Sequence, residues 1–389
     1  MVSSSSVRGL ATRAVFYMSS HKAFESQAAY DANTVTAIHT LQAWYNQGTG
    51  LWDTTGWWNS ANVMTVLADY AVQNHDSANS LGIPNIILNT YDQAQKTSFQ
   101  AIKSLNGAGL PISTYVKIPR RPSITARGFD DFLNDYYDDE GWWALALIRS
   151  HDVGVSGLGD QKFLQAAMRI FEDMKGGAST CGGIYWSKVG TYTNAIANEL
   201  YLKVAASLAN RVPGQKDYYL DIAKKEWDWF KTSGMINQDN LINDGLNDNC
   251  KNNGGNTWTY NQGVILGALV ELSKATGDRS FLNEASSIAT AAIVHLTRDG
   301  ILYEGCEPDC GADGAQFKGI FMRNLRELQQ AAPQDAFKNF LLQNADTIWA
   351  KDRNNQNQLG PTWTGPFATA SAGTHSSAMD ALVAAIAVA

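Results

Sequence analysis

The sequence contains no apolar run long enough to cross a membrane and no surplus of positive charge. A transmembrane helix needs about 20 consecutive apolar residues, and no stretch of the 389-residue chain approaches that length. The chain has 30 Lys and Arg against 37 Asp and Glu, a net charge of −7. Because nucleic-acid binding requires a basic face, we expect no nucleic-acid or membrane partner. The charge favours a neutral ligand.

Neither end of the sequence carries a recognisable targeting segment. The N-terminal "MVSSSSVRGLATRA" lacks the apolar stretch of a secretory signal, and the C-terminal "ALVAAIAVA" is shorter than the tail of a lipid-anchor signal. We expect residues 1–25 to be an N-terminal extension, either a trimmed mature end or a cloning remnant. Residues 26–389 are expected to form a single catalytic domain and the protein to be a monomer.

Histidine is scarce, and no metal or cofactor motif is present. The six histidines are scattered, none near a Ser or Cys in a nucleophile motif. They are His21, His39, His75, His151, His295 and His375. "NDGLNDNCKNNGGN" from residue 243 is rich in oxygen ligands but lacks EF-hand spacing. "NNGGN" and "GGIYW" lack the lysine and the strand of a phosphate loop. We therefore expect neither a metal nor a cofactor.

Only four cysteines occur, and all lie in loop-like sequence: Cys181, Cys250, Cys306 and Cys310. A structural zinc site needs pairs at tight spacing, and the pair formed by Cys306 and Cys310 has no equally tight partner pair. Two disulfides, 306–310 and 181–250, are the better interpretation. They indicate an oxidising compartment, so we expect a secreted, extracellular protein.

Aromatic residues are abundant, with 12 Trp, 15 Tyr and 14 Phe, or 11% of the chain. Most must belong to a core, but aromatic side chains left on a surface suit planar or ring-shaped ligands.

Apolar residues recur with the period of helices almost throughout the chain. "ANVMTVLADYAVQ", from residue 61, places its apolar residues on one helical face. Four helices are expected to begin with an Asp cap followed by an aromatic residue, at Asp160, Asp217, Asp278 and Asp335, at intervals of 57, 61 and 57 residues. Between them lies a second helix that follows a loop rich in Gly, Asn and aromatics.

This repeat predicts about six helical hairpins that close into an all-α (α/α)6 toroid. The Asp-capped helices would be outer and the others inner. The N-termini of the inner helices would then meet at one end of the ring and form a cleft there.

One of these loops reads "DYYDDEGWW", residues 135–143. Glu140 suits the first turn of a helix, where a negative charge meets the helix dipole. Capping does not explain Asp138 and Asp139 together, because burying like charges beside aromatic walls costs free energy.

Glycoside hydrolysis is the chemistry that needs two such carboxylates, one protonated and one ionised. Adjacent residues have Cα atoms about 3.8 Å apart. Carboxyl groups about 5 to 5.5 Å apart, the spacing of retaining enzymes, are therefore reachable, whereas the inverting gap of about 6.5 to 9.5 Å is harder to reach. The distance between adjacent residues leaves open which Asp takes which role.

The motifs resemble glycoside hydrolase family 76, the endo-α-1,6-mannanases. The resemblance rests on "WWNSANVMTVLADY", "YYDDEGWWALA", "GGIYWS", "TNAIANEL", "LINDGL", "TWTYNQGVILGAL" and "QFKGIFMRNL", in family order from about residue 44 to the end. It implies an (α/α)6 fold and retaining endo-hydrolysis of α-1,6-mannosidic linkages in fungal or yeast mannan. By that resemblance Asp138 is the nucleophile and Asp139 the acid/base.

The resemblance and the helix-start loops also suggest substrate-binding residues. They are Trp58, Asn59, Trp142, Asn194, Asp244, Tyr260, Asn261, Gln262, Phe317 and Lys318. Each has a plainer interpretation as a turn, cap, core or charge-neutralising residue. The expected partner is an α-mannan polysaccharide or oligosaccharide.

Three alternative functions stay open from the sequence alone. One is a mannan transglycosidase that uses the same carboxylate pair. Another is a catalytically silent carbohydrate-binding protein. A third is a different (α/α)6 sugar enzyme, which would need a His-rich or Arg-rich cleft.

Overall fold

The computed structural model describes residues 24–96, 99–107, 111–117, 132–154 and 160–389. Of the predicted N-terminal extension, residues 1–23 lie outside the described residues.

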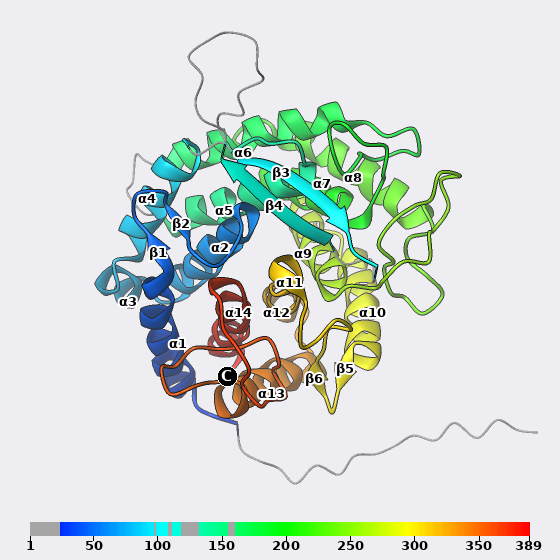
Figure 1. The fold of residues 1–389 in the computed structure, drawn as a ribbon. Helices are drawn as coiled ribbons and strands as arrows, with labels where there is room; N and C mark the ends of the chain where they lie inside the picture. Colours follow the sequence, from blue (N-terminus) through cyan, green and yellow to red (C-terminus); the bar gives the residue numbers. More distant parts are fainter. Residues whose placement is uncertain (1–23, 97–98, 108–110, 118–131, 155–159) are drawn as a thin grey trace, which may run out of the picture.

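Six helices of the described chain form an inner ring (Figure 1). They are α2 (Trp57–Gln73), α5 (Tyr137–Val153), α7 (Ala195–Ala209), α9 (Thr259–Thr276), α12 (Phe317–Ala331) and α14 (Ala372–Val388). Each packs against the next, and α14 packs back against α2, so the ring is closed. The predicted all-α (α/α)6 toroid is confirmed.

A second layer of helices surrounds the ring. It consists of α1 (Gln27–Leu41), α4 (Ile83–Ala94), α6 (Asp160–Met174), α8 (Lys216–Thr232), α10 (Ser280–His295) and α13 (Asp335–Lys351). Each contacts at least one inner helix, for example α6 on α5 and α8 on α7. Shorter pieces are α3 (His75–Ser80), α11 (Gly311–Gly314), η1 (Gln42–Trp44) and η3 (Lys175–Gly177).

The four helices predicted to be outer are outer, but their capping differs from the prediction. The N-caps of α8 and α13 are Gln215 and Gln334. Asp217 and Asp335 lie one position or more inside the helix, in the first turn, where their charge meets the positive end of the helix dipole. Asp278 precedes α10 and accepts a hydrogen bond from the Ser280 backbone N–H at 2.8 Å.

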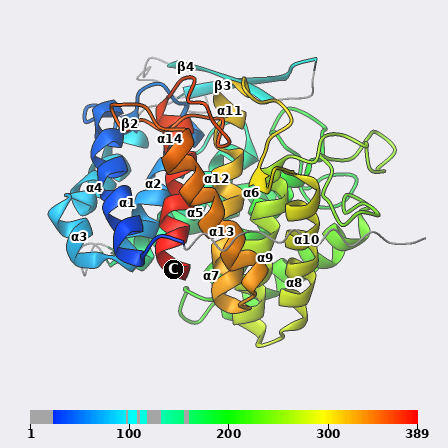
Figure 2. The same ribbon diagram turned by 90° about the horizontal axis from the view of Figure 1, so that it is seen from below.

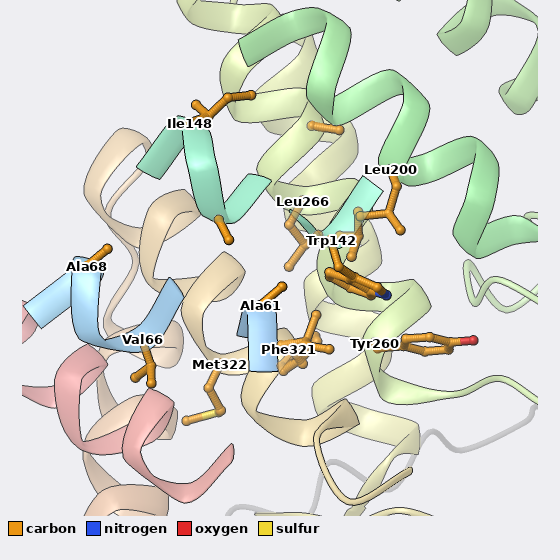
Figure 3. Packing of buried hydrophobic residues seen from close by; sticks show 14 of the residues in the cluster. Ala61, Val66, Ala68, Trp142, Ile148, Leu200, Tyr260, Leu266, Phe321 and Met322 are labelled. Carbon is orange, nitrogen blue, oxygen red and sulfur yellow. The ribbon is translucent and has the colours of Figure 1, made fainter. Parts of the chain in front are cut away.

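Small residues allow the inner helices to approach closely. A Cβ at Gly263 of α9 would lie 2.6 Å from the Phe321 Cα of α12, and one at Gly319 of α12 would lie 2.6 Å from the Ser377 Cα of α14. Figure 3 shows the resulting core, in which Trp142 of α5 and Leu266 of α9 lie within the ring. The inner helices are therefore buried on nearly all sides, their first turns included.

The described residues also form three antiparallel two-stranded sheets. They pair β1 (Tyr45–Asn46) with β2 (Leu51–Trp52), β3 (Phe99–Leu105) with β4 (Pro111–Lys117), and β5 (Thr297–Arg298) with β6 (Ile301–Leu302). The β3–β4 hairpin, in register from Phe99 opposite Lys117 to Leu105 opposite Pro111, lies across one end of the ring (Figures 1 and 2). The sequence analysis did not predict it.

Both predicted disulfides are confirmed. Cys181 pairs with Cys250 at a Cα–Cα distance of 5.2 Å, and Cys306 pairs with Cys310 at 5.0 Å. The first joins the loop before α7 to the loop before α9. None of the helices in the described ranges is long and apolar enough to cross a bilayer.

Candidate active site

The adjacent aspartates Asp138 and Asp139 lie in the first turn of α5, at the end of the ring beneath the β3–β4 hairpin. The Asp138 side chain is 9% exposed and that of Asp139 is fully buried. Asn134 prepares this turn, because its Oδ1 accepts a hydrogen bond from the Tyr136 backbone N–H at 2.8 Å. Its Nδ2 donates to Asp139 Oδ2 at 2.6 Å and fixes that carboxylate.

The third acid of the motif, Glu140, serves the start of the helix. Its Oε1 accepts hydrogen bonds from the Asn134 backbone N–H at 2.8 Å and from Lys188 Nζ at 2.6 Å. Burial raises the pKa of Glu140, although Lys188 opposes the rise. This agrees with the helix-start role expected from the sequence.

A lysine from the β3–β4 hairpin joins the two aspartates. Lys103 Nζ donates to Asp138 Oδ2 at 2.8 Å and lies 2.5 Å from Asp139 Oδ1. Its side chain is 2% exposed. The ammonium lies 4.9 Å from the ring centroid of Tyr136 and 5.5 Å from that of Trp186, distances at which a cation is attracted to an aromatic face. Lys103 was not among the residues expected from the sequence.

Burial and neighbouring charge determine the protonation of this cluster. Burial raises the pKa of Asp139, the positive charge of Lys103 opposes the rise, and the negative charge of Asp138 adds to it. Burial alone would lower the pKa of Lys103, but the two carboxylates outweigh it and the pKa is raised. The site therefore favours a charged lysine beside a carboxyl group that can hold a proton.

Two further acids flank the pair. Asp313 of α11 accepts hydrogen bonds from Trp58 Nε1 at 2.9 Å and from Ser113 Oγ of β4 at 2.6 Å. Asp244 accepts a hydrogen bond from the Tyr192 hydroxyl. Burial raises the pKa of Asp244 to about 6, with the charge of Asp138 adding to the rise. Asp244 was expected from the sequence, whereas Asp313 was not.

Four predicted aromatic residues form a continuous stack below the pair. Trp58 stacks on Trp142 with ring centroids 5.5 Å apart, and Trp142 lies 6.4 Å from Tyr260. Tyr260 stacks on Phe317 at 3.8 Å. All four come from the first two turns of inner helices and are buried. In Figure 3, Trp142 and Tyr260 lie next to each other between α5 and α9.

Several predicted polar residues bind the protein itself. Asn194 caps α7 by accepting a hydrogen bond from the Ala197 backbone N–H at 3.2 Å. Gln262 accepts from the Ile242 N–H at 2.8 Å and donates to the Ile242 carbonyl at 2.9 Å. Asn59 Nδ2 donates to Gln316 Oε1 at 3.0 Å. All three side chains are therefore engaged in holding helices and loops together.

Lys318 and Asn261 are both buried. Lys318 Nζ lies 2.5 Å from Glu307 Oε1 and donates to the Pro361 carbonyl at 2.7 Å, so the acid that it neutralises is Glu307. Asn261 is fully buried, and its side-chain amide has no hydrogen-bond partner among the residues that the structure describes.

Comparison with known sequences gives consistent relatives. The model of "Glycosyl hydrolase family 76" matches residues 23–388. The Schizosaccharomyces pombe protein C1198.07c is 32% identical over 213 residues, which cover 50% of this chain and 48% of that protein. The mannan endo-1,6-alpha-mannosidase DFG5 of Saccharomyces cerevisiae is 28% identical over 50% of this chain and 46% of its own length. The match thus spans about half the length of these curated relatives.

Solved structures share the fold. An inactive variant of the α-1,6-mannanase GH76A of Salegentibacter sp. HEL1_6, with two consecutive aspartates replaced by asparagine and α-1,6-mannotriose bound, gives a TM-score of 0.72. It is 20% identical, over 92% of this chain and 100% of that chain. Dfg5 from Chaetomium thermophilum, in complex with glucosamine, gives a TM-score of 0.74 at 18% identity, over 94% of this chain and 92% of that chain. Since the family model matches nearly the whole sequence, this chain belongs to glycosyl hydrolase family 76.

Proposed function

We propose that the protein is a retaining endo-α-1,6-mannanase whose catalytic residues are Asp138 and Asp139. The observation that carries the proposal is the pair itself: two buried neighbouring carboxylates in one rigid helical turn, above a stack of aromatic rings. The family membership and the mannanase names of the relatives support the same reaction. Residues 26–389 act as one catalytic domain in this proposal.

The environments of the two aspartates support distinct roles. Asp138 Oδ2 is held by Lys103, whereas its Oδ1 has no hydrogen-bond partner among the described residues. Oδ1 is therefore the oxygen that attacks the anomeric carbon and forms the glycosyl ester. Asp139 is the more buried of the two, and its raised pKa suits a general acid. It protonates the leaving oxygen and then accepts a proton from the water that cleaves the ester.

The surroundings of the pair suit a neutral sugar. Asp244 and Asp313 can accept hydrogen bonds from sugar hydroxyls, and the half-buried Trp186 offers a ring beside Lys103. The stacked rings of Trp58, Trp142, Tyr260 and Phe317 pack the helix starts around the pair. Asn261, next to Tyr260 in α9, has unused hydrogen-bonding capacity. We leave Asn59, Asn194, Gln262 and Lys318 out of the sugar contacts. The substrate in this proposal is α-mannan or its oligosaccharides.

An extracellular location follows in the same proposal from the two disulfides, because such bonds persist in oxidising compartments. We also propose that the enzyme acts as a monomer.

The activity is tested by incubation with debranched α-1,6-mannan and measurement of new reducing ends. Asp138→Asn and Asp139→Asn are the matched variants, because the amide keeps the shape and removes the charge. We expect oligosaccharide products from the unmodified protein and a loss of at least about a thousandfold in turnover in each variant. Absence of products from the unmodified protein, or near-normal turnover in either variant, would reject the proposal.

A further inference from the structure

Lys103 reaches the centre of the site from a hairpin that belongs to neither helical layer. We propose that Lys103 is a positioning residue that shares one positive charge between Asp138 and Asp139 and so sets which of them holds the proton at each step. The inference rests on the proposed function and adds a residue to it. Lys103 acts through the two carboxylates and does not itself touch the reacting atoms.

The contacts restrict where the charge can act. The ammonium is 2.8 Å from Asp138 Oδ2 and 2.5 Å from Asp139 Oδ1, and its side chain is 2% exposed. At such distances, and with little water to screen it, a unit charge interacts strongly with both acids. The Lys103 backbone N–H also donates to the Tyr136 hydroxyl at 3.1 Å, which ties this strand to the residue that caps α5.

The same contacts distinguish the four carboxylate oxygens. Lys103 holds Asp138 Oδ2 and leaves Oδ1 for the anomeric carbon. Asn134 holds Asp139 Oδ2, so the oxygen that must carry the transferable proton is Asp139 Oδ1, which Lys103 now faces. When substrate binds, the leaving oxygen of the sugar takes the place of the ammonium at Asp139 Oδ1. Lys103 then remains on Asp138 Oδ2, and Asp139 Oδ1 can carry the proton.

The charges balance through both halves of the reaction. In the first half, the bond from the anomeric carbon to the leaving oxygen breaks, the bond to Asp138 Oδ1 forms, and the Asp139 proton moves to the leaving oxygen. Asp138 is now a neutral ester, so Lys103 interacts with Asp139 alone and favours its ionised form. In the second half, Asp139 takes a proton from water, the water oxygen bonds to the anomeric carbon, and the ester bond breaks.

The other charged and titratable groups around the pair do not supply the positive charge that Lys103 brings. Asp313 on α11 and Asp244 in the loop before α9 add negative charge to the site. Lys188 is engaged elsewhere, 2.6 Å from both Glu140 Oε1 and Asp173 Oδ2. The remaining groups that face or adjoin the cluster are Tyr136, Tyr192, Glu199 and Tyr260. Loss of Lys103 would therefore leave the carboxyl groups of the site near one another without its positive charge.

The test is the pH dependence of kcat/KM on debranched α-1,6-mannan for Lys103→Met and Lys103→Arg. Removing the cation favours the protonated form of Asp139, because the positive charge of Lys103 opposes the rise in the pKa of that acid. The basic limb of the pH profile in Lys103→Met, which reports the acid, should therefore move to higher pH by about one unit, with a fall in the maximum of about tenfold or more. Lys103→Arg should keep the limbs near their original positions. Lys225→Met is the control, since Lys225 is exposed and pairs with Asp221 one turn earlier on α8.

A merely structural role for Lys103 would lower the maximum without moving either limb. An unshifted profile in Lys103→Met therefore overturns the inference. Near-normal turnover in Asp138→Asn and Asp139→Asn would overturn the proposed function instead. If those two variants are inactive and the Lys103→Met profile is unshifted, only the present inference fails.

A second experiment covers the case in which Lys103→Met does not fold. The four cysteines of the sequence are all in disulfides, so Lys103→Cys introduces a single thiol. Alkylation with 2-bromoethylamine restores an ammonium at nearly the original length, whereas iodoacetamide adds a neutral group. We expect only the first adduct to regain the original pH profile. Equal profiles for the two adducts would contradict a role for the charge.

Discussion

Asn134 binds two consecutive acids: its side-chain amide donates to Asp139 Oδ2 at 2.6 Å, and its backbone N–H donates to Glu140 Oε1 at 2.8 Å. One residue thus fixes both the helix start and the carboxyl group proposed as the acid/base. The proposed general acid is held in place by the segment before the helix as well as by the helix itself.

The first prediction concerns that hydrogen bond. A donor to a carboxylate favours its ionised form and lowers its pKa, so Asn134→Ala should raise the pKa of Asp139. Since a general acid works while it is protonated, the basic limb of the kcat/KM profile should move to higher pH. A loss of helix-start stability of about 1 kcal/mol should accompany it. Activity titrations on debranched α-1,6-mannan measure the limb, and an unmoved limb would separate Asn134 from the acid/base.

The second prediction uses Glu226 of the outer helix α8, remote in sequence from the catalytic pair. Burial raises the pKa of Glu226 from its usual 4.5 to about 8. Because the pKa in the folded state is the higher one, folding favours the protonated acid. Its contribution to stability is fully present below about pH 4.5 and is lost as the pH rises through about 8.

Glu226→Gln should therefore be more stable than the unmodified protein at pH 9 by up to about 4 kcal/mol. The difference should shrink towards pH 4. Urea unfolding at the two pH values measures it. Glu284→Gln, at a half-buried position on α10, is the control for removal of one carboxylate elsewhere. Equal stability of Glu226→Gln and the unmodified protein at pH 9 would show that Glu226 is not protonated by burial.

The third prediction ranks the two disulfides. The Cys181–Cys250 bond closes a segment of 69 residues, whereas Cys306–Cys310 closes one of only 4. In the chain-entropy account, a longer closed loop restricts the unfolded chain more. Replacing the first pair with serine should lower the free energy of unfolding by about 2 to 4 kcal/mol, and replacing the second by less. Denaturant unfolding of the two double variants, without reductant, gives the ranking; the reverse order would contradict it.

The helical ring and the disulfides were predictable because their signals are local. The apolar period of residues 61–73 and the spacing of the four Asp-aromatic starts specify helices and their pairing. The cysteines were few enough for spacing to suggest the pairs. The adjacent Asp138 and Asp139 were recognisable because two like charges among aromatics make poor sense as structure.

The rest of the site depends on tertiary contacts that no local sequence pattern predicts. Lys103 contacts Asp138 and Ser113 contacts Asp313 from a hairpin whose position across the ring is a tertiary contact. The Asn106-Gly107 pair that follows "FQAIKSL" is the signal that could have revealed the hairpin. Asn194 precedes α7 and Asp244 precedes α9. Because both lie in sequences typical of helix starts, the sequence alone did not show that Asn194 caps its helix whereas Asp244 flanks the catalytic pair.

The most direct test of the central claim follows the anomer released from debranched α-1,6-mannan by ¹H NMR in the first minutes, before mutarotation. Two displacements at the same carbon, through an ester on Asp138, return the original configuration. We predict that new reducing ends appear first as α-mannose and only later equilibrate with β-mannose. The appearance of β-mannose first would mean a single displacement by water and would contradict the account of Asp138 as a nucleophile.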